Sequence, residues 1–166
     1  MESYIVQLDF SSAFDRVSHS GLFFKLKSFG VDGSVLSICR EFLSNCRQRV
    51  LVDGATSEWI PIVSGMLQGI VLGSLLFILY TSEMFELVGN RLYAYADDST
   101  LLAVHKPADR PAVAASLSRV FARIQEWCCH WCMILNLNKT KALVVSRSSD
   151  PFVLVPVLTF LVVVWQ

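Results

Sequence analysis

Three aspartates carry the chemistry that this sequence offers. Asp97 and Asp98 are adjacent and lie in a short apolar stretch, residues 92–104, that otherwise has the pattern of two strands. Asp9 lies near the end of a separate apolar run, residues 4–10. Neighbouring carboxylates repel each other and resist desolvation, so such a pair is seldom placed between strands for stability alone. Carboxylate oxygens are the ligands that Mg²⁺ prefers, and three of them could hold two ions about 3.5–4 Å apart, as in phosphoryl transfer.

The same residues also fit a purely structural interpretation. Asp97-Asp98 has the composition of a tight β-turn, and Asp9 could cap the end of a strand. On these residues alone the two interpretations are about equally good. The elements around the aspartates must therefore decide between them.

Hydrophobic periodicity predicts a chain of mixed helices and strands. Apolar alternation predicts strands at residues 4–10, 91–96, 99–104 and 142–146. Helical spacing predicts helices at about residues 20–30, 35–43, 71–88 and 109–131. Residues 47–52 and 58–63 flank Asp53-Gly54, which is typical of a hairpin.

This order of elements predicts an α+β fold, an antiparallel sheet with helices packed on one face. It corresponds to a split βαβ, ferredoxin-like arrangement. In such a sheet the end of the first strand and the turn between the central pair can approach each other. We therefore expect Asp9 to lie close to Asp97 and Asp98.

Composition indicates a folded domain of ordinary size. The chain has 166 residues, of which 54% are hydrophobic and 17% charged, which excludes a disordered protein. We expect residues 1–150 to form one domain and residues 151–166 an apolar tail, either a buried strand or an unpaired segment. The tail is shorter than the roughly 20 residues of a membrane span, so contact with a membrane is the less favoured interpretation of it. The formal net charge of zero weighs against a self-sufficient nucleic-acid binder.

Cysteine usage predicts an intracellular protein with reduced thiols. The chain has five cysteines and no secretory pattern at its N-terminus. Residues 128–132 resemble half of a zinc site, but no second pair follows at finger-like spacing. Buried thiols on a packed helix are therefore favoured. The helical spacing of Trp127 and Trp131 likewise favours core packing over stacking on bases.

Four sequence blocks occur in a defined order. They are residues 8–19, residues 67–77, Tyr95-Ala96-Asp97-Asp98, and residues 135–141 with the pattern Asn-x-x-Lys-Thr. Together they resemble the palm of a reverse transcriptase, most of all those of the non-LTR (LINE-type) retrotransposons. A Tyr-x-Asp-Asp tetrapeptide alone is weak evidence, whereas four ordered blocks at compatible spacing are strong. The residue patterns of the first and fourth blocks favour this family over the related palm of group II intron maturases.

The resemblance implies an RNA-directed DNA polymerase, a nucleotidyltransferase that extends a DNA primer on an RNA template from dNTPs. Its cofactor would be Mg²⁺, with Mn²⁺ as a substitute. Asp9, Asp97 and Asp98 would be the catalytic carboxylates and metal ligands, and the main-chain carbonyl of Phe10 would complete the metal site. Lys139 would donate a proton to the leaving pyrophosphate.

The resemblance also implies a nucleotide site. Phe10 and Phe14 would lie at the incoming nucleotide, where the Phe14 ring leaves no room for a 2′-hydroxyl. Gln68 and Gly69 would lie against the template base and the nucleotide. The family usually has Ser where Ile70 stands, and this departure bears on nucleotide handling.

The family's fingers and thumb are not expected within this sequence. We therefore expect a partial palm of a longer parent protein, weakly active or inactive as an isolated chain. If it serves as a retroelement enzyme, its location would be nuclear. The alternative is a non-catalytic retroelement remnant that acts at most as an interaction or structural module.

Overall fold

The computed structural model describes residues 1–88, residues 92–147 and the backbone of residues 160–164. The chain forms two compact units. The first combines Met1–Ala13 with Thr81–Gln166, and the second is Phe14–Tyr80. All three aspartates of the predicted metal site belong to the first unit.

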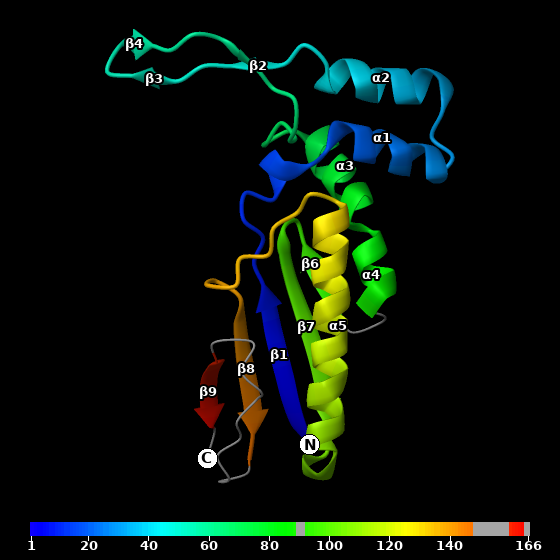
Figure 1. Cartoon of the computed structure of the whole chain (residues 1–166), viewed down its shortest axis with the longest axis vertical. Coiled ribbons are helices and arrows are strands. Elements are labelled where there is room, and N and C mark those ends of the chain that lie inside the picture. Colours follow the sequence, from blue (N-terminus) through cyan, green and yellow to red (C-terminus); the bar gives the residue numbers. More distant parts are fainter. Residues whose placement is uncertain (89–91, 148–159, 165–166) are drawn as a thin grey trace. The chain divides into compact units, whose positions relative to one another are not determined.

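A sheet forms the centre of the first unit (Figure 1). Its order is β6-β7-β1-β8-β9. The strands are β1 (Glu2–Leu8), β6 (Leu92–Tyr95), β7 (Asp98–His105), β8 (Lys141–Ser146) and β9 (Phe160–Val164). β1 is antiparallel to both β7 and β8, and β6 is antiparallel to β7, which confirms the predicted antiparallel sheet. β9 extends this sheet by pairing parallel to β8.

β9 comes from the predicted apolar tail. Residues 160–164 are strand in their backbone. The rest of the predicted tail, residues 151–159 and 165–166, lies outside the described residues.

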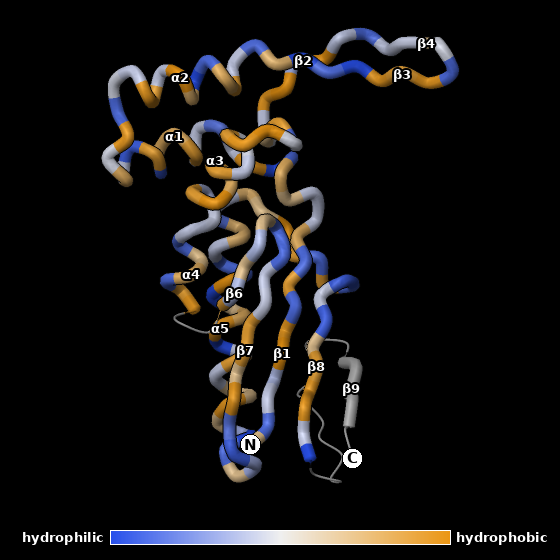
Figure 2. The backbone as a smooth tube through the Cα atoms, turned by 180° about the vertical axis from the view of Figure 1, so that it is seen from behind, coloured by the Kyte–Doolittle hydropathy of each residue, from blue (hydrophilic) through white to orange (hydrophobic). Residues whose placement is uncertain are grey.

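The two-residue period of the strands decides which face of the sheet is covered. Buried and more exposed residues alternate along β1, β7 and β8. Tyr4, Ala103 and Val144, one from each of these strands, form a buried cluster on which Val113 and Leu117 pack. The last two belong to α5 (Arg110–His130), which lies across this face with α4 (Glu83–Val88) beside it (Figures 1 and 2). The helices described in this unit thus cover one face, as predicted.

The end of α5 is part of the core. Trp127 and Trp131 are buried, which confirms the prediction of core packing. Burial raises the pKa of the Cys128 thiol to about 12, so this thiol is protonated at neutral pH. Cys129 and Cys132 are exposed free thiols, so the buried-thiol prediction holds for only one of the three clustered cysteines.

The second unit consists of a 3-10 turn, three helices and a hairpin. The turn is η1 (Phe14–Arg16), and the helices are α1 (His19–Ser28), α2 (Gly33–Leu43) and α3 (Val71–Thr81). In the hairpin, β2 (Arg47–Gln48) pairs with β5 (Ile60–Pro61), and β3 (Leu51–Val52) pairs with β4 (Ala55–Thr56). Asp53 and Gly54 have φ values of 49° and 83°. Positive φ at both positions is what a type I′ turn requires, so the predicted hairpin is confirmed.

The single helix predicted at residues 71–88 is wrong, because the structure has two helices there. α3 ends at Thr81, and α4 begins at Glu83 after a turn at Ser82. The Ser82 carbonyl accepts a hydrogen bond from the Phe85 N–H at 3.0 Å, and serine is a preferred residue at a helix start. By length and composition alone this segment is apolar enough to cross a membrane, but the break at Ser82 interrupts it.

A buried lysine ties α1 to the end of α3. Lys25 is 0% exposed, and its ammonium donates a hydrogen bond to the Tyr80 carbonyl. The same ammonium lies 5.1 Å from the centroid of the Tyr80 ring. A positive charge at the carbonyl end of a helix also complements the helix dipole.

We expect Lys25→Met to lower the free energy of unfolding by about 1–3 kcal/mol, because the buried Tyr80 carbonyl loses a charged donor while the apolar stem is largely kept. Lys27→Met is the matched control, since Lys27 lies on the same helix and is exposed. Urea unfolding of both variants is the measurement. Equal stability of the two variants would contradict a structural role for the Lys25 ammonium.

Candidate active site

The aspartate pair lies where β6 turns into β7. Asp97 is in the two-residue turn, and Asp98 is the first residue of β7, paired with Tyr95. Ala96, the other turn residue, has a φ of 54°. This left-handed conformation costs a residue with a side chain on the order of 1 kcal/mol, and such strain concentrates at functional sites. Both carboxylates are exposed.

Asp9 lies at the same end of the sheet as the pair. It directly follows β1, whose last residue, Leu8, pairs with Ser99 of β7. The antiparallel register therefore brings Asp9 alongside Asp98. A cavity of about 400 Å³ opens at this point, and its lining comprises Gln7, Leu8, Asp9, Asp98, Asn138, Lys139 and Lys141.

Phe10 is held in a short ladder beyond the end of β1. The Ser11 N–H donates to the Ile134 carbonyl at 2.8 Å, and the Asn136 N–H donates to the Asp9 carbonyl at 2.8 Å. These two bonds flank the Phe10–Leu135 pair. In this type of antiparallel pair the residue's own N–H and C=O point away from its partner. The Phe10 carbonyl thus points away from Leu135.

The predicted catalytic residues are brought together only in part. Asp9, Asp98 and Lys139 line one cavity, whereas Asp97 is on the adjoining turn and outside this lining. Within the described ranges, no three or more His, Cys, Asp or Glu side chains are gathered in a metal-binding group. The donor types nevertheless fit a hard cation, because carboxylates and a main-chain carbonyl are all oxygen ligands.

The residues predicted to bind the nucleotide, apart from Phe10, belong to the second unit. The Phe14 ring stacks on Phe77 of α3, with centroids 4.3 Å apart and planes at 16°. The Phe14 carbonyl accepts a hydrogen bond from the Met66 N–H at 2.9 Å, so the loop that carries Gln68 and Gly69 begins beside Phe14. Both loop residues are exposed. Their contact with a nucleotide stays a prediction.

Two glycines of this region have roles that the sequence did not reveal. A Cβ at Gly65, whose φ is +94°, would lie 2.9 Å from the Asp15 Cα. A Cβ at Gly73 would collide with the Leu67 carbonyl oxygen. These close approaches hold the loop against η1 and against the start of α3. The sequence shows where the glycines are, but it does not show which backbone atoms approach them.

The chain matches a known family along most of its length. The sequence model of the family described as "Reverse transcriptase (RNA-dependent DNA polymerase)" matches residues 1–154. The RNA-directed DNA polymerase from mobile element jockey of Drosophila melanogaster is 31% identical over 140 residues, which cover 80% of this chain. The probable RNA-directed DNA polymerase from transposon BS of the same species is 31% identical over 143 residues, covering 81% of this chain. These matches span only 15% and 16% of the two relatives.

Solved structures show the same fold. Apo telomerase from Candida tropicalis, truncated from its C-terminal domain, matches with a TM-score of 0.65 and 18% identity, covering 90% of this chain and 32% of that chain. Telomerase from Candida albicans, in complex with a TWJ fragment of telomeric RNA, matches with a TM-score of 0.63 and 15% identity, covering 90% and 27%. At such identities the likeness establishes the fold alone.

Proposed function

Because the chain belongs to the reverse transcriptase (RNA-dependent DNA polymerase) family, as the resemblance to LINE-type enzymes predicted, we propose that it is the catalytic palm portion of an RNA-directed DNA polymerase. One observation carries the proposal. A single cavity is lined by Asp9, Asp98 and Lys139. It lies where the C-terminal end of β1, the N-terminal end of β7 and the segment after α5 meet. The proposed partners are an RNA template, a DNA primer and dNTPs.

The proposed fold is a palm of the split βαβ, ferredoxin-like kind. Its support is the strand order of the first unit, in which β1 lies between β7 and β8, and β6 follows β7 at the edge. All neighbouring pairs among these four strands are antiparallel. This is the order that two interleaved βαβ units produce.

In the proposed reaction Asp9, Asp97 and Asp98 would hold Mg²⁺ together with the Phe10 carbonyl. When bound, the ions lower the barrier to deprotonation of the primer 3′-hydroxyl and neutralise charge on the leaving pyrophosphate. Lys139 places an ammonium at the same cavity, where it can pair with phosphate oxygens and donate a proton. Lys141 adds a second positive charge there, and the resemblance assigns no role to it.

The proposal keeps the nucleotide-handling residues that the resemblance implies. Phe14 is the residue that would exclude a 2′-hydroxyl, and its stacking on Phe77 would limit the movement of its ring. Gln68 and Gly69 would lie against the template base and the dNTP. Ile70, which is 44% exposed, replaces the family's usual serine in this loop. It offers an apolar surface where the family has a hydroxyl.

Primer extension tests this proposal. With a DNA primer on an RNA template, dNTPs and Mg²⁺, we expect slow template-dependent incorporation by the chain. The rate should be low because basic contacts to phosphates supply much of nucleic-acid affinity, and this chain has no net charge. Asp97→Asn should abolish incorporation. Undiminished incorporation by that variant would refute the assigned carboxylate role, and an inert wild type that also binds no Mn²⁺ would favour the non-catalytic module.

A further inference from the structure

The turn that carries Lys139 is closed by its own hydrogen bonds. The Thr140 N–H and hydroxyl both donate to the Asn136 carbonyl, each at 2.8 Å. The Lys139 N–H donates to the same carbonyl at 3.2 Å and lies 3.3 Å from the Asn136 side-chain Oδ1. Residues 136–140 therefore form one closed loop of chain, which we call the Asn136–Thr140 turn.

This turn also binds both backbone polar groups of Asp9. The Asn136 N–H donates to the Asp9 carbonyl at 2.8 Å, and the Asp9 N–H donates to the Thr140 hydroxyl oxygen at 3.4 Å. Thr140 is 1% exposed, so water does not compete for its hydroxyl. One buried oxygen thus accepts from Asp9 while its proton goes to the Asn136 carbonyl.

These hydrogen bonds limit where the proposed metal ligands can lie. Fixing the N–H and C=O of Asp9 fixes the point from which its carboxylate leaves the main chain. The same peptide leads into Phe10, whose carbonyl direction is set by the ladder with Leu135. Lys139 belongs to the turn and lines the cavity with Asp9. The Asn136–Thr140 turn therefore holds in place both the proposed metal ligand Asp9 and the Lys139 ammonium.

We propose that Thr140, with Asn136, is a positioning residue that sets the geometry of Asp9 and Phe10 for metal binding. The inference rests on the proposed function, because it assumes that these groups hold a divalent ion. Thr140 does not touch the ion in this scheme and acts through Asp9. Hydrogen bonds behind metal ligands typically contribute about 10–100-fold to metal affinity.

Mn²⁺ binding to the 166-residue chain, followed by electron paramagnetic resonance, tests the role of the hydroxyl. Thr140→Val keeps the shape and removes only the two hydrogen bonds of the hydroxyl, so we expect Mn²⁺ affinity to fall by about 10–100-fold. Thr140→Ser keeps the hydroxyl and should restore most of the affinity. Thr100→Val is the matched control, because it removes a hydroxyl from partly buried Thr100 on β7 and should leave affinity unchanged.

The outcomes separate this inference from the function on which it rests. If the wild type binds Mn²⁺, Asp9→Asn loses binding and Thr140→Val binds as tightly as wild type, the positioning role is refuted and the proposed function stands. If the wild type itself binds no Mn²⁺, both are refuted. Should Thr140→Val fail to fold, Thr140→Cys replaces it. A thiol is a weak hydrogen-bonding group, so an affinity for Mn²⁺ equal to that of the wild type would equally refute the role.

Discussion

Asp9→Asn is expected to weaken Mn²⁺ binding by about 10²–10³-fold, and Asp98→Asn by a similar factor. Each change keeps the size of the side chain and removes one negative charge from the cavity. Two unit charges about 4 Å apart interact by roughly 4 kcal/mol near a protein surface, and each 1.4 kcal/mol is a factor of ten in affinity. The charge of a divalent ion increases this attraction, and solvent at the exposed rim reduces it.

Asp53→Asn is the control for this result. Asp53 is exposed, lies in the type I′ turn of the second unit, and has a positive φ that asparagine also accepts. The variant removes the same charge from the chain and should bind Mn²⁺ as wild type does. If Asp9→Asn and Asp53→Asn bind equally well, the ion does not depend on Asp9.

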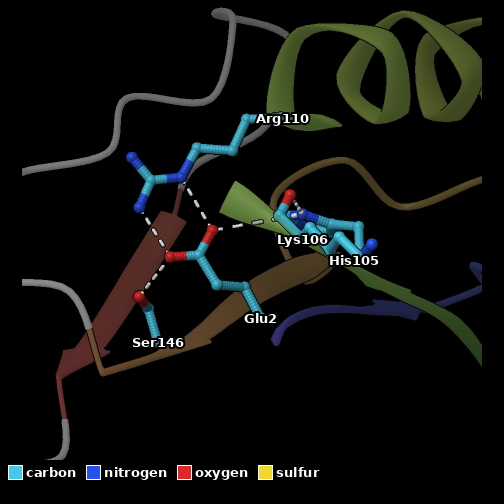
Figure 3. Close-up of polar contacts among 5 residues, drawn as sticks. All are labelled: Glu2, His105, Lys106, Arg110 and Ser146. Carbon is cyan, nitrogen blue, oxygen red and sulfur yellow. Dashed lines mark hydrogen bonds and ion pairs between the residues drawn. The ribbon is translucent and has the colours of Figure 1, made fainter. Parts of the chain in front are cut away.

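Arg110→Met is expected to destabilise the protein by about 3–5 kcal/mol, because it leaves the Glu2 carboxylate buried without its cation. Glu2 is 3% exposed. Its carboxylate accepts hydrogen bonds from Arg110 Nε at 2.7 Å, Arg110 Nη2 at 2.5 Å and the Ser146 hydroxyl at 2.5 Å (Figure 3). His105 Nδ1 lies 4.0 Å from the same carboxylate.

The measurement is urea unfolding of three variants. Glu2→Gln/Arg110→Met should recover much of the stability that Arg110→Met loses, since no uncompensated charge remains buried. The stability of Glu2→Gln alone should lie between that of Arg110→Met and that of the wild type. A single variant Arg110→Met within about 0.5 kcal/mol of wild type, the range of ordinary surface substitutions, would contradict this account.

The same ion pair predicts how stability depends on pH. The Arg110 hydrogen bond, with smaller contributions from Ser146 and His105, lowers the pKa of Glu2 from its ordinary 4.5 to about 2, although burial opposes the shift. Because the folded-state pKa is the lower one, the stabilisation is complete above about pH 4.5 and is lost as the pH falls toward 2. Glu2→Gln should remove this part of the acid dependence, and an unchanged pH profile would contradict it.

Local sequence patterns were sufficient to predict several elements. The two-residue period predicted β1, β6, β7 and β8 of the central sheet, because one face of each strand must be buried. Asp53-Gly54 predicted its hairpin because few dipeptides accept positive φ at both positions. The proximity of Asp9 and Asp98 also followed from the sequence, since an antiparallel pairing of their strands brings those ends together.

Other features depend on partners that are remote in sequence. The Glu2–Arg110 and Glu2–Ser146 bonds join residues 108 and 144 positions apart, and the Asp9–Thr140 bond spans 131 positions. No local pattern encodes such pairs. The break at Ser82 escaped detection because serine is tolerated inside helices as well as at their starts. The close contact at Gly73 is made with the main chain of Leu67, and amino-acid composition does not predict such a contact.

The most direct test of the account is a crystal structure of the chain with Mn²⁺, in which anomalous scattering locates the ion. We predict a peak bonded to carboxylate oxygens of Asp9 and of Asp97 or Asp98, and to the Phe10 carbonyl, at oxygen distances of about 2.0–2.2 Å. Binding of Mn²⁺ elsewhere would contradict this metal site. An Asp9 carboxylate on the opposite side of the sheet from the pair, beyond the reach of two ions about 3.5–4 Å apart, would contradict it equally.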